Sequence, residues 1–543
     1  MKVQPENVGD LVEFGARRHP NRPALRSRDG QLRTYADLDE RSSRFANALI
    51  GLGLSRGERI AAWMDDRFEY IELYLAAAKA GLVVCPINAR YVASEAAYLL
   101  ADSEARLLVW TPDQDEKVAE LDAGIWSETI AVRVGGRTRG DRGSGPSHGV
   151  LRSEAPVART TDYESLVSTA SAARPAVLIE PDDLFILGYT SGTTGRPKGA
   201  MLTHGSVLAL GVQNSISYRF GEYPTVALTG SMSFVSVIPA QVLTTLRMGG
   251  TLTVMGTWAP ADLLDTIRRD RISFTYIPSP LLGELTELLD RDREAWRTLE
   301  TVLHSASKAD PTHLAALYSV IGSRLLEGWG MTEHSGGLAA ATTERDYFGA
   351  TSTSPVFGSV GRPAFNVDVR VIGTDGHPAP ADGDTVGELL IASPALMSGY
   401  WKNPEASRAA LQNGWFHSGD LGTIDPDGYV HVTDRRNDLI VSGGMNVYPS
   451  ELEHYIATLP GVRRVAVVGA PHPRWGQTVV AVVVADPAAR LTEEIVIEYC
   501  RRGMASYKKP SRVLFVSQLP ETTSRKVARQ ELREQVRQAL GVD

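Results

Sequence analysis

The sequence Tyr189-Thr190-Ser191-Gly192-Thr193-Thr194-Gly195-Arg196-Pro197-Lys198-Gly199 carries the strongest signal in this chain. Its hydroxyl side chains, its glycines and its single lysine suit the binding of nucleotide phosphates. The apolar run at 184–187 predicts a buried strand before the loop, and residues 202–212 predict the opening of a helix after it. The phosphate loop of NTPases ends in Gly-Lys-Ser/Thr. Here Pro197 precedes the lysine and Gly199 follows it, which excludes that class of GTPases and kinases.

Length and composition narrow the class of protein. A chain of 543 residues exceeds what one core supports, so we expect two or more domains. A net charge of −8 gives no broad basic surface for nucleic acid. The only cysteines, Cys85 and Cys500, make a disulfide framework or a cysteine metal site unexpected. The start lacks a signal peptide and no apolar run approaches a membrane span, so we expect a cytoplasmic protein.

The order of predicted elements indicates an α/β multidomain fold. Apolar strands alternate with helical patterns in the first part, which predicts layers with largely parallel sheets. The predicted pieces are 38–49 (helix), 60–64 (strand), 70–80 (helix), 82–87 and 107–110 (strands), 251–255 (strand), 263–267 (helix) and 274–277 (strand). The stretch 135–149, rich in Gly, Arg and Ser, predicts an exposed loop.

The later part of the chain changes pattern. Short strands at 367–372, 388–391 and 428–432 alternate with turn dipeptides such as Asp427-Gly428. The charged run 434–438 marks a boundary, and a helix from Pro449 opens a small α+β unit. We therefore expect a large N-terminal domain of layered α/β subdomains plus a β-rich subdomain (1–433), a hinge (434–438) and a small α+β C-terminal cap (439–543).

Several later motifs join the phosphate loop in a fixed order. They are Gly328-Trp329-Gly330-Met331-Thr332-Glu333, His417-Ser418-Gly419-Asp420, Asp434-Arg435-Arg436-Asn437-Asp438, Ser442-Gly443-Gly444-Met445-Asn446 and Thr523-Ser524-Arg525-Lys526. With them the chain resembles the AMP-forming adenylating enzymes, from about residue 21 to nearly its end. That superfamily contains acyl- and aryl-CoA synthetases, the adenylation domains of nonribosomal peptide synthetases, and beetle luciferases.

The resemblance implies a site for ATP and Mg²⁺. Trp329 would stack on adenine, Thr332 would reach the α-phosphate, and Glu333 would hold Mg²⁺. Asp420 would accept hydrogen bonds from the ribose, and Arg435 would add a ribose or phosphate contact. The loop would hold the β- and γ-phosphates. Its binding residues are Thr190, Ser191, Gly192, Thr193, Thr194 and Lys198, and the adenine and acyl floor adds Ser305, Ala306, Ser307, Gly328, Gly330 and Met331.

The resemblance also implies two half-reactions that use one site. Lys526 would bridge the substrate carboxylate and the α-phosphate while the acid attacks ATP. The cap would then rotate about Asn437, and coenzyme A would enter a tunnel lined by Gly443 and Gly444. Two residues depart from the family pattern: Asn437 lacks the charge of the usual Asp or Lys, and Arg525 stands where Gly is common.

The expected acyl pocket comprises Met232, Phe234, Val235 and Gly330. Phe234 stands where a histidine is common, which favours a hydrophobic acid. No acidic residue stands at Val235, where amino-acid-activating relatives carry an Asp for the substrate ammonium. The pocket therefore predicts a fatty, aryl or bulky cyclic acid as the small-molecule partner.

The predicted function is an acid–CoA ligase that forms acyl-CoA, AMP and pyrophosphate. One alternative is an acyl-AMP ligase that loads a carrier-protein thiol. Another is a catalytically silent binder of nucleotide, which the presence of Lys198, Glu333, Asp420 and Lys526 disfavours. Neither nucleic acid nor a membrane span is expected, and both a monomer and a homodimer stay open.

Overall fold

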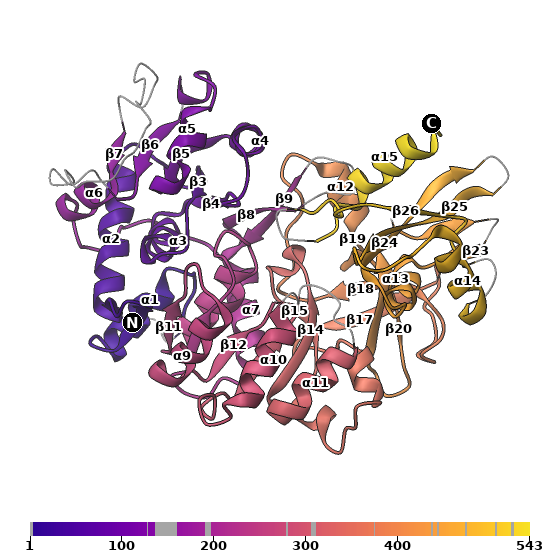
Figure 1. Cartoon of the computed structure of the whole chain (residues 1–543). Helices are drawn as coiled ribbons and strands as arrows, with labels where there is room; N and C mark the ends of the chain where they lie inside the picture. Colours follow the sequence, from indigo (N-terminus) through magenta and orange to yellow (C-terminus); the bar gives the residue numbers. More distant parts are fainter. Residues whose placement is uncertain are drawn as a thin grey trace. The chain divides into compact units, whose positions relative to one another are not determined.

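The computed structural model divides the chain into two compact units (Figure 1). The first contains Met1–Gly192, Arg196–Asp368 and Ala392–Phe416, and the second contains Thr193–Gly195, Val369–Ile391 and His417–Asp543. The predicted boundary at 434–438 stays a prediction. The residues that the structure describes are 4–127, 129–135, 160–190, 197–278, 281–305, 311–373, 375–435, 438–442, 445–472, 475–504, 508–522 and 526–542.

The first unit contains a seven-stranded sheet in the order β7-β6-β5-β3-β4-β8-β9. All its neighbours are parallel except β8 and β9, which confirms the predicted α/β layering. Trp63, Leu108 and Leu99 pack in one buried cluster of this layer. The strands are β3 (Arg59–Trp63), β4 (Val83–Pro86), β5 (Ala105–Trp110), β6 (Ile130–Arg133), β7 (Thr161–Asp162), β8 (Leu184–Thr190) and β9 (Lys198–Thr203).

A nine-stranded sheet forms the second layer of this unit, in the order β16-β15-β14-β13-β12-β10-β11-β1-β2. Its middle strands are parallel, whereas the β1–β2, β14–β15 and β15–β16 pairs at the two edges are antiparallel. The strands are β1 (Pro23–Ser27), β2 (Leu32–Thr34), β10 (Thr225–Leu228), β11 (Thr251–Val254), β12 (Phe274–Tyr276), β13 (Thr301–His304), β14 (Leu325–Gly330), β15 (Leu338–Ala341) and β16 (Arg362–Pro363).

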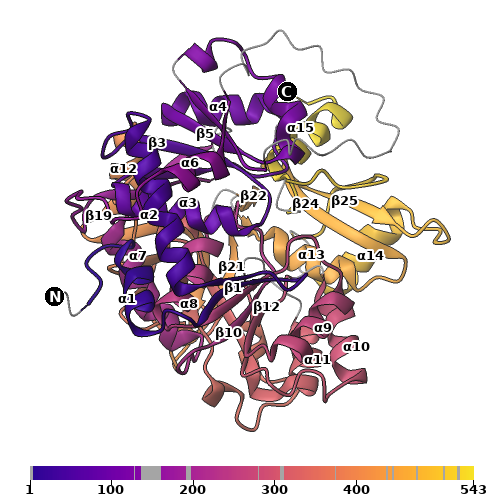
Figure 2. The same ribbon diagram turned by 90° about the vertical axis from the view of Figure 1, so that its left-hand side faces the viewer.

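Helices cover these sheets. The helices α9 (Pro260–Asp270), α10 (Leu282–Arg291) and α11 (Pro311–Ile321) lie side by side in Figures 1 and 2. The helix α8 (Thr244–Arg247) packs against β11 and contacts α1 and α7. The remaining helices of this unit include α1 (Asp10–Arg18), α2 (Tyr35–Gly51), α3 (Phe68–Ala80), α4 (Ala93–Ser103), α5 (Asp115–Ala119), α6 (Tyr163–Thr169), α7 (His204–Ser217) and α12 (Pro404–Ala410).

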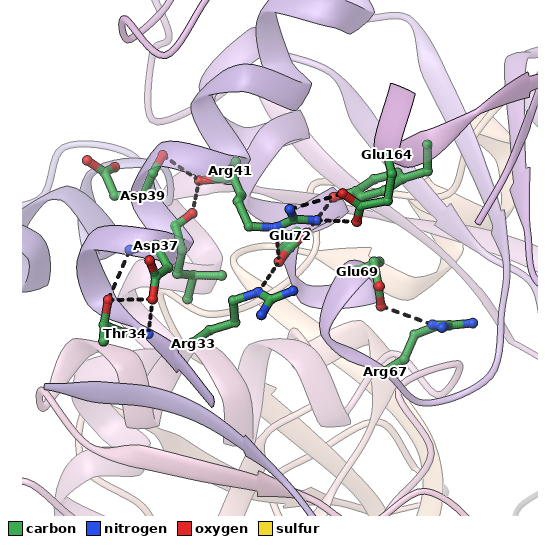
Figure 3. A network of polar contacts seen from close by, with 12 residues as sticks. Arg33, Thr34, Asp37, Asp39, Arg41, Arg67, Glu69, Glu72 and Glu164 are labelled. Atoms are coloured by element: carbon green, nitrogen blue, oxygen red, sulfur yellow. Dashed lines mark hydrogen bonds and ion pairs between the residues drawn. The ribbon is translucent and has the colours of Figure 1, made fainter. Parts of the chain in front are cut away.

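Buried charges connect α2, α3 and α6 (Figure 3). The carboxylate of Glu72 on α3 is fully buried and accepts hydrogen bonds from Arg41 Nε (2.7 Å) and the Tyr163 hydroxyl (2.7 Å). The Nζ of Lys79, also on α3, donates to Asp39 Oδ1 at 2.6 Å. Because a charge buried without partners is costly, these pairs fix how the three helices pack.

Two smaller sheets are formed mainly by the second unit, although β19 (Leu411–Gln412) and the first two residues of β20 belong to the first unit. One has the order β17-β18-β20-β19, with β21 paired to β20, and the other has the order β23-β22-β25-β24, with β26 paired to β25. The strands are β17 (Asp368–Ile372), β18 (Gly387–Ala392), β19 (Leu411–Gln412), β20 (Trp415–Ile424), β21 (Val430–Arg435), β22 (Ile440–Ser442), β23 (Met445–Val447), β24 (Val462–His472), β25 (Gly476–Ala485) and β26 (Arg512–Phe515). The helices are α13 (Pro449–Ala457), α14 (Glu493–Gly503) and α15 (Arg529–Leu540).

The helix predicted at 202–212 is confirmed as α7, but a strand that the sequence analysis did not predict precedes it. Residues 198–203 form a strand, β9, antiparallel to β8, and the helix α7 begins only at His204. Thr203 is the reason for that start, because its side chain accepts from Ser206 N–H in a capping box. The phosphate loop thus connects two strands of a hairpin rather than a strand and a helix. Most of the predicted exposed loop, 136–149, lies outside the described residues. Among the described helices, none has the length and apolarity that a membrane span requires.

Candidate functional site

The ends of β8 and β9 carry the described part of the phosphate loop. Thr190 and Lys198 are opposite each other in the antiparallel register and form the last pair of the hairpin. Ser191, Gly192, Thr193 and Thr194 lie outside the described residues, so their phosphate contacts stay a prediction. The expected phosphate lysine therefore lies at the loop end of the hairpin, opposite Thr190, which carries the first hydroxyl of the loop.

The helix α4 fixes this hairpin from one side. The Tyr189 hydroxyl on β8 donates to Asp102 Oδ2 at 2.6 Å, and the Tyr98 hydroxyl donates to the Pro197 carbonyl at 3.1 Å. Burial raises the pKa of Tyr189, and its hydrogen bond to Asp102 raises the pKa further. The strand β8 and the residue that precedes β9 are thus both hydrogen-bonded to the same helix.

Glu333, the expected magnesium ligand, lies in a short 3₁₀ turn, Thr332–His334, after β14. Its Oε1 accepts a hydrogen bond from the Tyr400 hydroxyl at 2.9 Å. The Nζ of Lys198 lies 5.4 Å from the centroid of the same tyrosine ring. Tyr400 therefore brings together two residues that the sequence assigned to ATP and to the metal.

The described residues fit the binding of Mg²⁺ through one carboxylate. Among them, no group of three or more His, Cys, Asp or Glu side chains could enclose a metal ion. Mg²⁺ commonly binds through one or two carboxylates together with water and substrate phosphates. Glu333 is half-buried and has a tyrosine donor on one oxygen, so it suits an ion that is shared with the phosphates of ATP.

The expected acyl-pocket segment lies against the same strand, β8. A Cβ atom at Gly188 would lie 2.8 Å from Val235 Cγ2 and 3.0 Å from Thr332 Cγ2. A Cβ atom at Gly336 would lie 2.5 Å from Ser236 Cα. The close approach of Val235 and Thr332 thus depends on the absence of a side chain at position 188. An expected acyl residue and the expected α-phosphate residue therefore meet across one glycine.

Asp66, which the sequence analysis missed, positions the acyl-pocket segment. Its Oδ1 accepts from Met232 N–H at 2.7 Å and from the Ser231 hydroxyl at 3.2 Å. Burial of the carboxyl raises the pKa of Asp66 to about 6, although both hydrogen bonds oppose that rise. Asp66 follows β3 of the seven-stranded sheet, so one carboxyl group ties that sheet to the loop carrying Met232, Phe234 and Val235.

The expected adenine floor lies at the ends of β13 and β14, which are parallel neighbours. Ser305 directly follows β13, and Gly328, Trp329 and Gly330 form the end of β14. Ligands of α/β sheets bind at the carboxyl ends of parallel strands, and the role of these residues in binding adenine stays a prediction. Trp329 is buried, and the Met331 carbonyl accepts from His334 N–H at 3.1 Å to shape the turn. Ala306 and Ser307 lie outside the described residues.

Two polar groups support this floor. His304 Nδ1 lies 2.5 Å from Glu327 Oε2, and both side chains are buried. Burial raises the pKa of Glu327, and His304 opposes that rise. A Cβ atom at Gly330 would lie 2.0 Å from the Gly337 carbonyl oxygen, so position 330 accepts only glycine in this arrangement.

The second unit carries the remaining candidates. Asp420 on β20 is buried and pairs with Arg435 on β21 in the antiparallel register, so the two expected ribose residues are backbone neighbours. Asp420 N–H donates to the Ser418 hydroxyl at 3.0 Å, and that hydroxyl donates to the Leu389 carbonyl at 2.6 Å. Asn437, Gly443 and Gly444 lie outside the described residues.

Lys526 is hydrogen-bonded through its backbone to Thr522 in this unit. Its carbonyl accepts from Thr522 N–H at 2.7 Å, and its own N–H donates to Thr522 Oγ1 at 3.2 Å. The residue is exposed. Its role in the reaction stays a prediction.

Tyr400 and Asp66 are the functional candidates that the sequence did not identify. The hydrogen bond of Tyr400 spans 67 residues to Glu333, and that of Asp66 spans 166 residues to Met232. Neither residue lies in a phosphate or metal motif. The one available signal is the Gly399-Tyr400-Trp401 sequence, in which two aromatic residues follow a glycine.

Comparison with known families gives a match over most of the chain. Residues 12–401 match the AMP-binding enzyme family, and residues 451–526 match the AMP-binding enzyme C-terminal domain. Feruloyl-CoA synthase from Amycolatopsis sp is 34% identical over 532 residues, which cover 98% of this chain and 99% of the relative. Long-chain-fatty-acid–CoA ligase FadD13 from Mycobacterium tuberculosis is 32% identical over 544 residues, which cover 98% of each chain.

Solved structures agree with these matches. The crystal structure of ATP-bound MatB from Rhodopseudomonas palustris superposes with a TM-score of 0.83 at 27% identity and covers 98% of this chain and 99% of that one. The Mycobacterium tuberculosis fatty acyl CoA synthetase gives a TM-score of 0.74 at 28% identity, with coverage of 98% and 99%. The large mixed α/β part and the smaller α+β part thus match the fold of adenylate-forming enzymes. The chain belongs to the AMP-binding enzyme family.

Proposed function

We propose that this chain is an AMP-forming acid–CoA ligase for a hydrophobic carboxylic acid, of fatty, aryl or bulky cyclic type. The observation that carries the proposal is the convergence at the end of β8. There Tyr400 contacts Lys198 and Glu333, while Thr332 and Val235 meet across Gly188. Residue types suited to phosphate, metal and acyl group thus gather in one unit.

In the first half-reaction, a carboxylate oxygen of the acid attacks the α-phosphorus of ATP. The bond from that phosphorus to the bridging oxygen breaks, and pyrophosphate leaves with the electron pair. Both reactants are anions, so cations and hydrogen-bond donors lower the barrier. Lys198 and the loop hydroxyls would hold the β- and γ-phosphates, Thr332 would donate to the α-phosphate, and Lys526 would bridge it to the acid. Glu333 would hold Mg²⁺, whose charge would stabilise the departing pyrophosphate.

In the second half-reaction, the thiolate of coenzyme A attacks the carbonyl carbon of the acyl-adenylate, and AMP leaves. Rotation at Asn437 and a tunnel lined by Gly443 and Gly444 are part of this proposal. Support comes from the named relatives, a feruloyl-CoA synthase and a long-chain-fatty-acid–CoA ligase. A carrier-protein thiol would react in the same way, and the cytoplasm, which supplies ATP and coenzyme A, is the expected location.

The acyl-pocket segment supports a hydrophobic substrate. Met232 and Val235 are buried and Phe234 is half-buried. Transfer of apolar substrate surface onto such side chains is favourable by about 25 cal/mol per Å², whereas a charged substrate group would lose its hydration there. The 34% identity to a feruloyl-CoA synthase supports aryl acids among these candidates.

The test is acid-dependent exchange of labelled pyrophosphate into ATP, run over a panel of hydroxycinnamic, long-chain fatty, cyclic aliphatic and short dicarboxylic acids. We expect exchange with one hydrophobic class and none with the dicarboxylic control. Added coenzyme A should then give the thioester. Exchange followed by transfer only to a phosphopantetheinyl carrier protein would replace the CoA assignment, and nucleotide binding without exchange for any acid would overturn the enzyme proposal.

A further inference from the structure

Tyr400 contacts both charged residues at the phosphate end of the proposed site. Its hydroxyl donates to Glu333 Oε1 at 2.9 Å, and its ring centroid lies 5.4 Å from Lys198 Nζ. A hydrogen bond to a carboxylate is stronger than one between neutral groups. An ammonium within about 6 Å of a ring centroid is attracted to the ring face. One side chain thus constrains a carboxylate and a cation that the reaction needs at the same nucleotide.

The backbone around Tyr400 is fixed to the strand that carries Lys198. Met201 N–H donates to the Gly399 carbonyl at 2.9 Å, and Trp401 N–H donates to the Gly199 carbonyl at 2.8 Å. Tyr400 N–H donates to Ser407 Oγ at 2.8 Å. Gly399 has a φ of 145°, a conformation that favours glycine. The tyrosine and the lysine are therefore held on adjacent, hydrogen-bonded backbone segments.

Glu333 is held to the same segment by its backbone. The Met397 N–H donates to the Glu333 carbonyl at 2.8 Å, and the Ser398 N–H donates to the Met201 carbonyl at 2.9 Å. Residues 397–401 therefore lie between the turn that carries Glu333 and the strand that carries Lys198. The side chain of Tyr400 also contacts both Glu333 and Lys198. The distance between the carboxylate and the ammonium is therefore constrained by backbone hydrogen bonds and by side-chain contacts.

A tyrosine with only a structural role looks different in this chain. The Tyr318 hydroxyl also makes a 2.9 Å hydrogen bond, but it donates to the backbone carbonyl of Tyr347, and the two rings stack at 5.4 Å. Its acceptor is neutral, and neither residue belongs to a site motif. Tyr318 is therefore a matched control for the loss of a hydroxyl that makes a similar hydrogen bond.

We propose that Tyr400 is a positioning residue that acts through Glu333 and Lys198. Its hydroxyl fixes the orientation of the Glu333 carboxylate. The carboxylate therefore loses little conformational entropy when it binds the metal of MgATP. The ring of Tyr400 attracts the Lys198 ammonium from one side without accepting a conventional hydrogen bond. The N–H donors of Lys198 therefore stay available to the phosphates. The inference rests on the proposed function, because it assigns those two residues to the metal and the phosphates.

The test measures binding rather than turnover. A non-hydrolysable ATP analogue is titrated calorimetrically into wild type, Tyr400→Phe, Tyr400→Met and Tyr318→Phe, first in EDTA and then at stepped Mg²⁺ concentrations. For Tyr400→Phe we expect the Mg²⁺ midpoint of nucleotide binding to rise about three- to tenfold, with metal-free affinity unchanged. For Tyr400→Met we expect the same rise in the Mg²⁺ midpoint. The metal-free affinity for the nucleotide should also fall about two- to fivefold, because the aromatic ring beside Lys198 is absent.

A double-mutant cycle locates the effect. In a Glu333→Gln background, Tyr400→Phe should not shift the Mg²⁺ midpoint further, because the hydroxyl has lost the group through which it acts. Additive shifts, a Tyr400→Phe midpoint within twofold of wild type, or an equal shift in Tyr318→Phe would overturn the proposal. If Tyr400→Met does not fold, Tyr400→Trp, which keeps a ring without the hydroxyl, should retain metal-free affinity, and its loss would overturn the role of the ring.

Failure of the proposed function gives a separate result. Wild type would then bind the analogue without any acid-dependent pyrophosphate exchange, whatever the Tyr400 variants do. A normal wild-type exchange together with unshifted variants would instead remove only the role of Tyr400.

Discussion

Two glutamates of the first unit, Glu72 and Glu333, show how differently one fold uses a carboxylate. Glu72 is fully buried and accepts from Arg41 Nε, Arg33 Nε and the Tyr163 hydroxyl (Figure 3). Glu333 is half-buried, and among the described residues the donor to its side chain is Tyr400. A fully buried carboxylate with three protein donors is inaccessible to a ligand, whereas a partly exposed one held by a single donor can still bind a metal. The difference predicts that changes at the first affect stability and changes at the second affect chemistry.

The largest effect should follow from the substitution Glu72→Gln. It leaves Arg41 without its buried carboxylate, and breaking a buried ion pair costs about 3–5 kcal/mol. We expect the free energy of unfolding, measured by denaturant titration, to fall by that amount. The matched control is Glu164→Gln, which removes an exposed partner of the same arginine and should cost less than about 1 kcal/mol. Equal losses in the two variants would remove the distinction between saturated and exposed carboxylates.

Lys526→Ala tests the opposite case, an exposed charge to which the proposed function gives a role in the first half-reaction. The lysine is exposed, so its removal should leave the unfolding midpoint unchanged. Loss of one donor that stabilises transition-state charge lowers a rate by about 10²–10³-fold. We expect a decrease of this size in the rate of pyrophosphate exchange. Thioester formation from supplied acyl-AMP should be spared. Arg501→Ala, which removes a cation paired with Glu498 on α14, is the control, and an equal loss of both half-reactions in Lys526→Ala would contradict the two-step account.

Asp66→Asn tests a third case, a buried carboxyl group whose pKa is raised by burial. Burial raises its pKa to about 6, so its contribution to stability is complete below the unfolded value near 3.8 and is lost as the pH rises through 6. The variant avoids that loss and keeps an acceptor for Met232 N–H. We expect it to gain up to about 3 kcal/mol over wild type between pH 4 and pH 7.5.

Thermal unfolding across that range measures the gain, and Asp37→Asn supplies a control of opposite sign. The Thr34 N–H is the main group that lowers the pKa of Asp37, so that variant should lose stability relative to wild type at neutral pH, and the loss should shrink as the pH falls below 3.8. A pH-independent difference between Asp66→Asn and wild type would show that Asp66 is not buried as a carboxyl group.

The smallest effect is expected at the hairpin. Tyr189→Phe removes the hydrogen bond to Asp102 and should lower the free energy of unfolding by about 1 kcal/mol. Because Tyr189 precedes the phosphate loop, we also expect a higher KM for ATP. Tyr318→Phe should give a similar stability change with KM unchanged. A higher KM in both variants would mean that general destabilisation, and not the hairpin, weakens ATP binding.

The sequence predicted the elements whose pattern is local. The helix α2 and the strands β3, β5 and β8 follow directly from apolar periodicity, and motif order identified the family. The strand β9 was missed because its residues do not alternate, and its strand form depends on pairing with β8 and with residues 398–401.

The contacts within the site could not be predicted for a related reason. The partners of Tyr400 and Asp66 lie far away in the chain, and only the packing of two sheets brings them together. The small distances at Gly188 and Gly336 likewise depend on backbone positions. The sequence shows that a glycine is present at these positions. It does not predict which distant residue lies close to that glycine.

The most direct test is a single-turnover reaction of the protein with α-labelled ATP, Mg²⁺ and the preferred acid, without coenzyme A. The account predicts up to one equivalent of bound acyl-adenylate per chain, formed only with the acid present, followed by release of AMP and thioester when coenzyme A is added. Label that stays in ATP with every acid, although the nucleotide binds, would contradict it.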